Sequence, residues 1–509
     1  MKISLLTAGS RGDTQPFVAL GVALEKLGVQ VTVAAGENFK HLVTEHGLRY
    51  SQVRIDIDKV LASGQVDDAM KAAGPIKMLR SIDRPEFMSV FLKLQQDYAQ
   101  ACQGADAVVF HPGASVAHFL ARERGIPAFL GAPFPMTSSA EYPAILLYGR
   151  KIPRFLNRLT HRLFYQGFWM AIRKPIALYF KNLDGQKRSF ENPFLHDGNK
   201  LISCSNRIFK TSEPAFCKGY WFFDEGDRYQ APADLVDFLQ RGEKPIYVGF
   251  GSVGSHGEAA FKTRMVVEAV AECGCRALIA TGAGGLDDAV EASDSIHFIR
   301  EAPHAWLFPR VALVVHHGGA GTTAAGMRAG VPSLIIPHGN DQFAWGQRVH
   351  DLGVGARPIA NKKLTSAALL AGIQEALQPE IVNAARTLGE QLRAEDGAAD
   401  TARYIVDRVQ QQPAAAPPGL SGPSTLGLGV LVLLLAPLLV PLIPGSLFFL
   451  IQAIRGVPLA DSLEIVRALV DPLRPYARLA TIASVVVTLL LLFRKYRTRR
   501  AALVHTETK

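Results

Sequence analysis

The sequence predicts an α/β protein made of two doubly wound, Rossmann-like domains with a cleft between them. Three observations support this fold class. Residues 2–35 read as a strand, a helix and a second strand. The same alternation restarts near Arg241, after a polar and aromatic stretch. Short apolar runs separated by helical stretches are typical of parallel sheets, and 509 residues are enough for two cores.

The first domain opens with KISLLTA (Lys2–Ala8), an apolar run that predicts a strand followed by a glycine-rich turn. A helix is predicted from Gln15 to about Leu27, with Pro16 in its first turn, where proline is tolerated. VQVTVAA (Val29–Ala35) is the second predicted strand. Further strands are predicted at residues 107–111, 127–132, 245–251, 276–282, 296–299, 312–317 and 333–337.

Composition divides the chain into five segments. The two domains are predicted at residues 1–215 and 244–409, joined by an interdomain linker at 216–243. A linker rich in proline, alanine and glycine follows at 410–425, and residues 426–509 form a hydrophobic tail.

The tail predicts membrane attachment. Residues 426–454 carry no charged side chain, and a second apolar run at 479–493 is followed at once by RKYRTRR. We expect one or two transmembrane segments, at about 426–454 and 479–493, with both domains facing the cytoplasm. The formal net charge of +10 is concentrated in the tail, which favours a membrane as partner and argues against nucleic acid. A buried hairpin of a protein core is the alternative for these runs.

The sequence HHGGAGTT, from His316 to Thr323, follows a predicted strand and precedes a predicted helix. Its glycines let backbone N–H groups approach a ligand, and a helix N-terminus favours an anion. The hydroxyls of Thr322 and Thr323 and the imidazole of His317 add donors, and a protonated His317 would add positive charge. These residues indicate a phosphate site. A tight turn capped by threonine remains the alternative.

Asp341 and Gln342 follow the strand predicted at 333–337, at the edge where doubly wound sheets bind ligands. A carboxylate beside an amide can hold neighbouring hydroxyls, which is what a hexose requires. The alternative is that Asp341 caps the helix that begins near Gln342.

Residues 303–355 resemble the donor-sugar signature of the GT-B nucleotide-sugar glycosyltransferases of the family 1 type. The resemblance is narrower to sterol 3-β-glucosyltransferases and to the bacterial enzymes that glycosylate macrolides and glycopeptides. Residues 9–24, 131–137 and 247–252 are similar to further motifs of this group, so the resemblance covers about residues 1–410. It implies that domain 1–215 binds the acceptor and domain 244–409 the nucleotide sugar.

The resemblance also implies roles for single residues. Asp13 would be the general base. His317, Ala320, Gly321 and Thr322 would hold the donor diphosphate, with Thr323 beside them, and Asp341 and Gln342 would hold the sugar hydroxyls. The remaining donor contacts would be Ser10, Arg11 and Ser252, together with Ala302, His304 and Trp306 around the uracil. For Asp13, a helix N-cap role is compatible with catalysis.

The implied reaction is the transfer of a hexose from a UDP-sugar to the hydroxyl of a lipid, with inversion and without a metal. Glucose is the expected hexose, and a sterol or sterol-like alcohol is the expected acceptor. The UDP-sugar is a substrate, and no cofactor or metal is expected. Asp56–Asp58 has the DxD spacing of metal-dependent transferases but lies far in sequence from the phosphate motif. The alternatives are the same chemistry on a polyketide or other secondary metabolite, and a catalytically silent nucleotide-sugar-binding membrane protein.

One stretch lies outside these motifs. From Tyr142 to Leu183 the chain has no acidic residue, and eight basic residues alternate with aromatic ones. Helices of this composition dock on anionic bilayers. We interpret it as a membrane-facing surface, with the wall of an acceptor pocket behind a solvated basic face as the alternative.

Overall fold

A computed structural model of the chain describes residues 1–54, 85–186, 188, 190–195, 199–210, 215–222, 229–250, 259–281, 286–288, 293–339 and 341–411. The predicted apolar segments 426–454 and 479–493, most of the linker before them, Asp56–Asp58 and Ser252 lie outside the described residues. Within this described part of the chain, no helix has both the length and the apolar character that crossing a bilayer requires.

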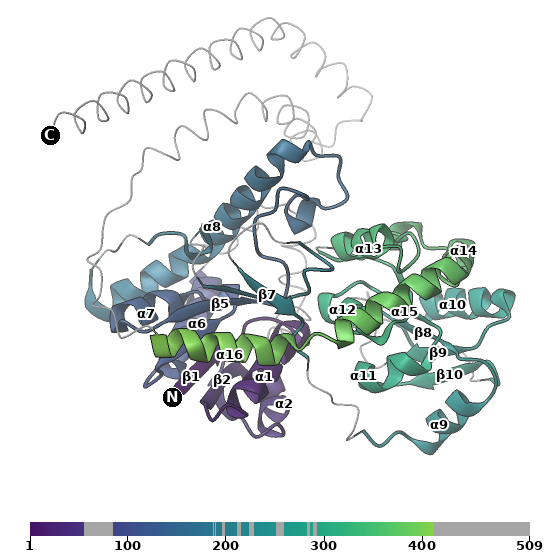
Figure 1. Cartoon of the computed structure of the whole chain (residues 1–509), viewed down its shortest axis with the longest axis horizontal. Coiled ribbons are helices and arrows are strands. Elements are labelled where there is room, and N and C mark those ends of the chain that lie inside the picture. The colour runs from purple at the N-terminus through teal and green to yellow at the C-terminus, as the bar shows by residue number, and fades with distance from the viewer. Residues whose placement is uncertain are drawn as a thin grey trace, which may run out of the picture. The chain divides into compact units, whose positions relative to one another are not determined.

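The first domain is a parallel sheet of seven strands in the described residues, in the order β3-β2-β1-β4-β5-β6-β7. Its strands are β1 (Lys2–Leu6), β2 (Gln30–Gly36), β3 (Arg49–Val53), β4 (Ala107–Phe110), β5 (Ala128–Ala132), β6 (Lys200–Ser203) and β7 (Phe216–Gly219). The helices are α1 (Arg11–Glu25), α2 (Lys40–Thr44), α6 (Pro85–Ala101), α7 (Val116–Arg124) and α8 (Asn157–Asp184) (Figure 1). Four of these strands, β1, β2, β4 and β5, were predicted, and β3, β6 and β7 are additions of the structure.

The second domain is a parallel sheet of five strands in the described residues, in the order β10-β9-β8-β11-β12. Its strands are β8 (Ile246–Gly249), β9 (Ala277–Ala280), β10 (Ile296–Ile299), β11 (Leu313–His316) and β12 (Ser333–Ile335), all of them predicted. The helices are α9 (Ala233–Gln240), α10 (Ala259–Cys273), α11 (His304–Leu307), α12 (Ala320–Ala329), α13 (Gln342–Asp351), α14 (Ser366–Ala376), α15 (Pro379–Arg393) and α16 (Gly397–Gln411).

Both sheets reverse their strand order at one point, and those points position the site. In the first sheet the reversal lies between β1 and β4, and in the second between β8 and β11. Ligands of doubly wound proteins bind outside the carboxyl ends of the strands at such points. Asp13 follows β1 and His317 follows β11 at these points, while Asp341 and Gln342 follow the neighbouring strand β12.

The last described helix, α16, returns to the first domain, as Figure 1 shows. Its Thr401 hydroxyl accepts a hydrogen bond of 3.0 Å from the indole of Trp221, and Tyr404 stacks on Phe216 with ring centroids 4.3 Å apart. Ala398, Ala402 and Ile405 are buried in the same core as α1 and β2. The segment predicted as the end of the second domain therefore packs on the first. Likewise, β7 lies in the predicted linker but completes the first sheet.

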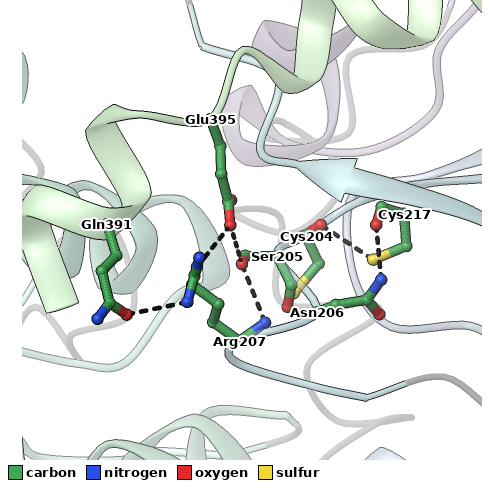
Figure 2. Close-up of polar contacts among 7 residues, drawn as sticks. All are labelled: Cys204, Ser205, Asn206, Arg207, Cys217, Gln391 and Glu395. Atoms are coloured by element: carbon green, nitrogen blue, oxygen red, sulfur yellow. Dashed lines mark hydrogen bonds and ion pairs between the residues drawn. The ribbon is translucent and has the colours of Figure 1, made fainter.

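Polar contacts between the domains stabilise the place where the chain passes from α15 of the second domain to α16 on the first. Arg207, just after β6, donates to Oε1 of Gln391 at 3.1 Å and pairs with Oε1 of Glu395 at 3.2 Å (Figure 2). Ser205 donates to the same carboxylate at 2.8 Å. Burial raises the pKa of Glu395, while Ser205 and Arg207 lower it. These contacts join the end of α15 to the loop after β6.

Candidate active site

Asp13 lies in the first turn of α1, directly after β1. The helix begins at Arg11, four residues before its predicted start, because Ser10 and Asp13 form its N-terminal cap. The Asp13 carboxylate accepts hydrogen bonds on Oδ2 from the backbone N–H of Ser10 at 2.8 Å and from its hydroxyl at 3.1 Å. Gly9 has φ +129°, which allows the sharp turn before the cap. Capping thus fixes Oδ2 and leaves Oδ1 as the second acceptor of the carboxylate.

His111, which was not predicted, faces that second oxygen. It directly follows β4, and its Nδ1 accepts a hydrogen bond of 3.1 Å from the N–H of Gly113. In the neutral imidazole this places the proton on Nε2. Nε2 is buried and lies 3.5 Å from Oδ1 of Asp13. A histidine at the end of a predicted strand beside a reversal of strand order was the available signal.

On the second domain, His317 and the N-terminus of α12 form the predicted phosphate site. Gly318 has φ +91° and lies so close to Ile335 that an added Cβ would be 2.6 Å from its methyl carbon. A Cβ on Gly319 would lie 2.7 Å from Nε2 of His317, so the imidazole lies beside the start of the helix. The loop therefore brings one imidazole next to the backbone N–H groups at the start of α12.

This helix start faces the first domain. A Cβ added to Gly321 would lie 3.9 Å from Cα of Gly12, so the N-termini of α1 and α12 approach each other. Ala320 and Thr322 are half-buried here. Thr323 is fully buried and donates its hydroxyl to the carbonyl of Gly319 at 2.8 Å. In this structure Thr323 therefore stabilises the first turn of α12 and does not present its hydroxyl to the cleft.

Three histidines near the start of α12, His304, His316 and His317, have lowered pKa values and are neutral at pH 7. Burial lowers the pKa of His317 to about 4, helped by His338. Burial also lowers the pKa of His304 to about 4, with contributions from Arg11 and His317, and His316 is lowered further. With this pKa, His317 is neutral at pH 7 and offers an N–H or a lone pair, while the positive charge of the other prediction would need a protonated ring. Arg11 of the first domain contributes to the lowered pKa of His304 in the second.

Asp341 and Gln342 begin α13 directly after the loop from β12. The Asp341 side chain makes no cap of the helix, which was the alternative prediction. Its Oδ2 instead accepts a hydrogen bond of 2.9 Å from the indole N–H of Trp345. Burial raises the pKa of Asp341, the Trp345 bond lowers it, and the charge of Asp13 raises it. The charges of these two carboxylates, one from each domain, therefore interact.

Gln342 is mostly buried and serves the loop before it. Its Oε1 accepts from the backbone N–H groups of His338 at 2.8 Å and Gly339 at 3.2 Å. The side-chain amide group is thereby oriented, with its oxygen toward the loop. Trp345, which was not predicted, packs edge-on against Phe209 of the first domain at a centroid distance of 5.3 Å.

The residues predicted to border the uracil lie in the short helix α11 or just before it. His304 stacks on Phe308 with ring centroids 4.3 Å apart. Trp306 contacts Tyr229 edge-on at 5.2 Å, and the Arg310 guanidinium lies over its ring at 4.4 Å. Ala302 is half-buried just before this helix. Among the residues described, no three His, Cys, Asp or Glu side chains are grouped to hold a metal ion.

Two family models match the chain. Residues 3–135 match the glycosyltransferase family 28 N-terminal domain, and residues 264–411 match the C-terminal domain of the erythromycin biosynthesis protein CIII-like family. The first match contains Asp13 and His111, and the second contains the α12 loop, Asp341 and α16.

Similar proteins with curated names are sterol 3-beta-glucosyltransferases. Those of Sclerotinia sclerotiorum and Candida albicans are each 33% identical, over 428 and 431 residues, covering 80% of this chain and 29% and 28% of those proteins. That of Arabidopsis thaliana is 31% identical over 423 residues, covering 78% of this chain and 64% of that protein. The chain thus spans less than a third of the length of these fungal relatives and less than two thirds of the plant one.

Solved glycosyltransferases share the fold. The glycosyltransferase SnogD from Streptomyces nogalater is 18% identical, with a TM-score of 0.58, covering 80% of this chain and all of that one. A Streptomyces sp. SF2575 glycosyltransferase complexed with thymidine diphosphate is also 18% identical, with a TM-score of 0.53, covering 80% and 99% of the two chains. At this identity the likeness concerns the fold.

Proposed function

Because the chain belongs to the GT-B glycosyltransferases of the family 28 and erythromycin CIII-like type, we propose that it transfers a hexose, glucose first, from a UDP-sugar to the hydroxyl of a sterol-like lipid. One observation carries the proposal. The capped carboxylate of Asp13 lies near the N-terminus of α12 and near Asp341, which supports a base on one domain acting on a donor held by the other.

In the proposed reaction, the acceptor hydroxyl oxygen attacks the anomeric carbon of the sugar while its proton passes to the Asp13 carboxylate. The bond from the anomeric carbon to the diphosphate oxygen breaks, and its electron pair leaves with UDP. General base catalysis of this kind contributes about 10²–10⁴-fold to a rate. A single displacement inverts the anomeric carbon, so an α-linked donor gives a β-glycoside.

The second domain would stabilise the leaving group. Negative charge grows on the diphosphate as the bond breaks, and the N–H groups at the start of α12 point toward such a charge. His317 would donate an N–H to the same group. Asp341 and Gln342 would hold the sugar hydroxyls, and Ala302, His304 and Trp306 would border the base. We propose no resident cofactor, since the UDP-sugar is itself consumed.

A sterol-like acceptor is supported by the names of the relatives that share 31–33% identity with the chain. The polyketide alternative has weaker support, because the solved kitacinnamycin and Streptomyces nogalater glycosyltransferases are only 19% and 18% identical to this chain. Attachment to a membrane through residues 426–509, with the two domains in the cytoplasm, is part of the proposal and rests on the sequence alone.

The test is turnover of labelled UDP-glucose with detergent-dispersed sterols by the full chain. UDP-galactose and dTDP-glucose serve as alternative donors. An unglycosylated polyketide with a free hydroxyl serves as the alternative acceptor. We expect a β-linked steryl hexoside, identified by mass and by the coupling constant of its anomeric proton. An α-linked product, or turnover with the polyketide acceptor alone, would contradict the proposal.

A further inference from the structure

Helix α8 and the loop before it divide their side chains between two surfaces. Tyr165, Trp169 and Phe180 are buried in the core of the first domain, and Phe164 and Phe168 pack against that core. Most aromatic residues of the stretch from Tyr142 to Leu183 therefore face inward. They form part of the domain core and are not available to a membrane.

The outward surface is basic. All eight basic residues of the stretch are exposed, and no acidic residue lies between Glu141 and Asp184. Arg158, Arg162 and Arg173 share a side of the helix, because steps of four and eleven residues are close to one and three full turns. The basic residues are Arg150, Lys151, Arg154, Arg158, Arg162, Arg173, Lys174 and Lys181.

Exposed apolar side chains lie among these basic ones. Phe155 is 83% exposed, the highest value among the large apolar residues of the described chain, and Leu183 is 61% exposed. Leu146, Leu163 and Met170 are exposed as well. Five of the eleven exposed large apolar residues in the described part of the chain thus fall within this stretch, which sets it apart from ordinary scattered surface residues.

We propose that this surface, here called the α8 basic surface and consisting of the eight basic residues together with Phe155, Leu163 and Met170, docks on an anionic lipid bilayer. Its charge complements acidic headgroups, and its apolar side chains can enter the boundary between headgroups and acyl chains. The occupant is therefore a membrane surface. The inference deepens the proposed function, because it brings the site to the place where a lipid acceptor lies.

Hydrogen bonds connect this surface to the loop beside the cleft. Asn157, at the start of α8, donates to the carbonyl of Ala140 at 3.0 Å, and the His161 ring bonds the carbonyl of Tyr142 at 3.1 Å. The same loop continues to Tyr148, whose hydroxyl donates to Asp351 of α13 at 2.9 Å. Docking through α8 would thus hold the loop that joins the acceptor domain to the helix of Asp341.

The experiment uses the full chain with a tryptophan reporter at the proposed contact. Phe155→Trp places the reporter in the α8 basic surface, and Phe261→Trp, at a 61% exposed phenylalanine of α10, is the matched control. Vesicles of brominated phosphatidylcholine with phosphatidylserine quench an indole that enters them. We expect quenching of the Phe155→Trp signal beyond that of the unchanged chain, and none for Phe261→Trp, even where the tail anchors both proteins.

Charge reversal then tests the electrostatic part. The triple variant Arg158→Glu, Arg162→Glu, Arg173→Glu should need at least about ten times more vesicles for half-maximal quenching of a tryptophan at position 155. The reason is that each basic residue near an anionic surface contributes to binding. Arg264→Glu, Lys362→Glu and Lys363→Glu change the net charge equally on the other domain and should have no such effect.

Equal quenching of the two reporters, or equal effects of the two reversals, would overturn the proposal. Blue-shifted emission from a tryptophan at position 155 that brominated lipid does not quench would also overturn it. That result would show that the chain itself covers the surface. Turnover of detergent-dispersed sterol is measured in parallel and should not change with the α8 reversals. Quenching of the Phe155→Trp signal together with no turnover by the unchanged chain would reject the proposed function and leave the docking intact.

Discussion

Nε2 of His111 lies 3.5 Å from Oδ1 of Asp13, although the two residues are nearly a hundred positions apart in the sequence. The neighbouring strands β1 and β4 bring them together at the point where the strand order reverses. Ser10 holds one oxygen of the carboxylate and His111 faces the other. The carboxylate that we propose as the base is therefore oriented by both loops of this reversal point.

Asp13→Asn is predicted to lower kcat by about 10²–10⁴-fold, because the amide cannot take the acceptor proton. UDP binding should change little, since the diphosphate contacts lie on the other domain. Turnover with saturating donor, together with calorimetric titration of UDP, checks both parts. A variant that keeps more than half of the wild-type kcat would remove Asp13 from the mechanism.

His111→Leu should lower kcat about 10-fold or more while leaving KM for the donor nearly unchanged, because only the orientation of Asp13 is lost. His111→Gln keeps an N–H donor near the position of Nε2 and should recover much of the loss. The measurement is the kcat and KM of both variants. If both variants lose activity equally, or if the loss appears in KM for the donor, His111 does not position the base.

Trp345→Phe is predicted to impair use of the donor sugar and not binding of UDP. The change keeps an aromatic ring against Phe209 but removes the indole N–H that holds Asp341. KM for UDP-glucose should rise several-fold, as it should with Asp341→Asn, while the inhibition constant of UDP stays the same. If UDP binding weakened to the same extent, Trp345 and Asp341 would belong to the diphosphate site instead.

The strand pattern was predictable because both sheets are buried. Each strand of the second domain is a short apolar run, and these runs were recognised in every case. β3 was missed because RYSQV is half polar and lies at the edge of its sheet, where one side faces solvent. β6 (KLIS) and β7 (FCKG) each contain a lysine and lack a continuous apolar run, and their pairing depends on β5 and on each other.

The site was predictable where one loop holds it and not where the fold assembles it. The α12 loop and the Asp341–Gln342 pair are each contiguous in sequence, so their composition alone made them candidates. His111 and Trp345 act through partners that are distant in sequence or one helical turn away. The position of His111 at a strand end was a signal, but it does not identify Asp13 as its partner. The neutral state of His317 also depends on burial by the whole domain, which no local pattern reports.

The buried histidines predict that the protein loses stability as the pH falls. His304 and His317 have pKa values of about 4 in the folded protein, below the ordinary value of 6.5. Between these values the unfolded chain binds more protons, so the free energy of unfolding decreases as the pH falls from about 6.5 toward 4. Each group contributes up to about 3 kcal/mol to this decrease. Thermal melts from pH 7 to 5 should show a shallower dependence for His317→Gln than for wild type, and identical slopes would contradict the assignment.

Gly397→Ala is predicted to destabilise the protein, because α16 crosses back to the first domain with no space for a side chain. An added Cβ would lie 2.3 Å from the carbonyl carbon of Gly219 and 2.4 Å from its oxygen, and backbone atoms cannot move aside as a flexible side chain can. Forcing the two segments apart should cost about 1–3 kcal/mol. Gly167→Ala is the matched control, since no atom lies within 4 Å of its added Cβ and the residue is exposed within α8. That change should stabilise the helix by about 0.5–1 kcal/mol. Thermal melts of the two variants should therefore shift in opposite directions, and a Gly397→Ala melt at or above the wild-type temperature would show that α16 does not hold the two domains together at this crossing.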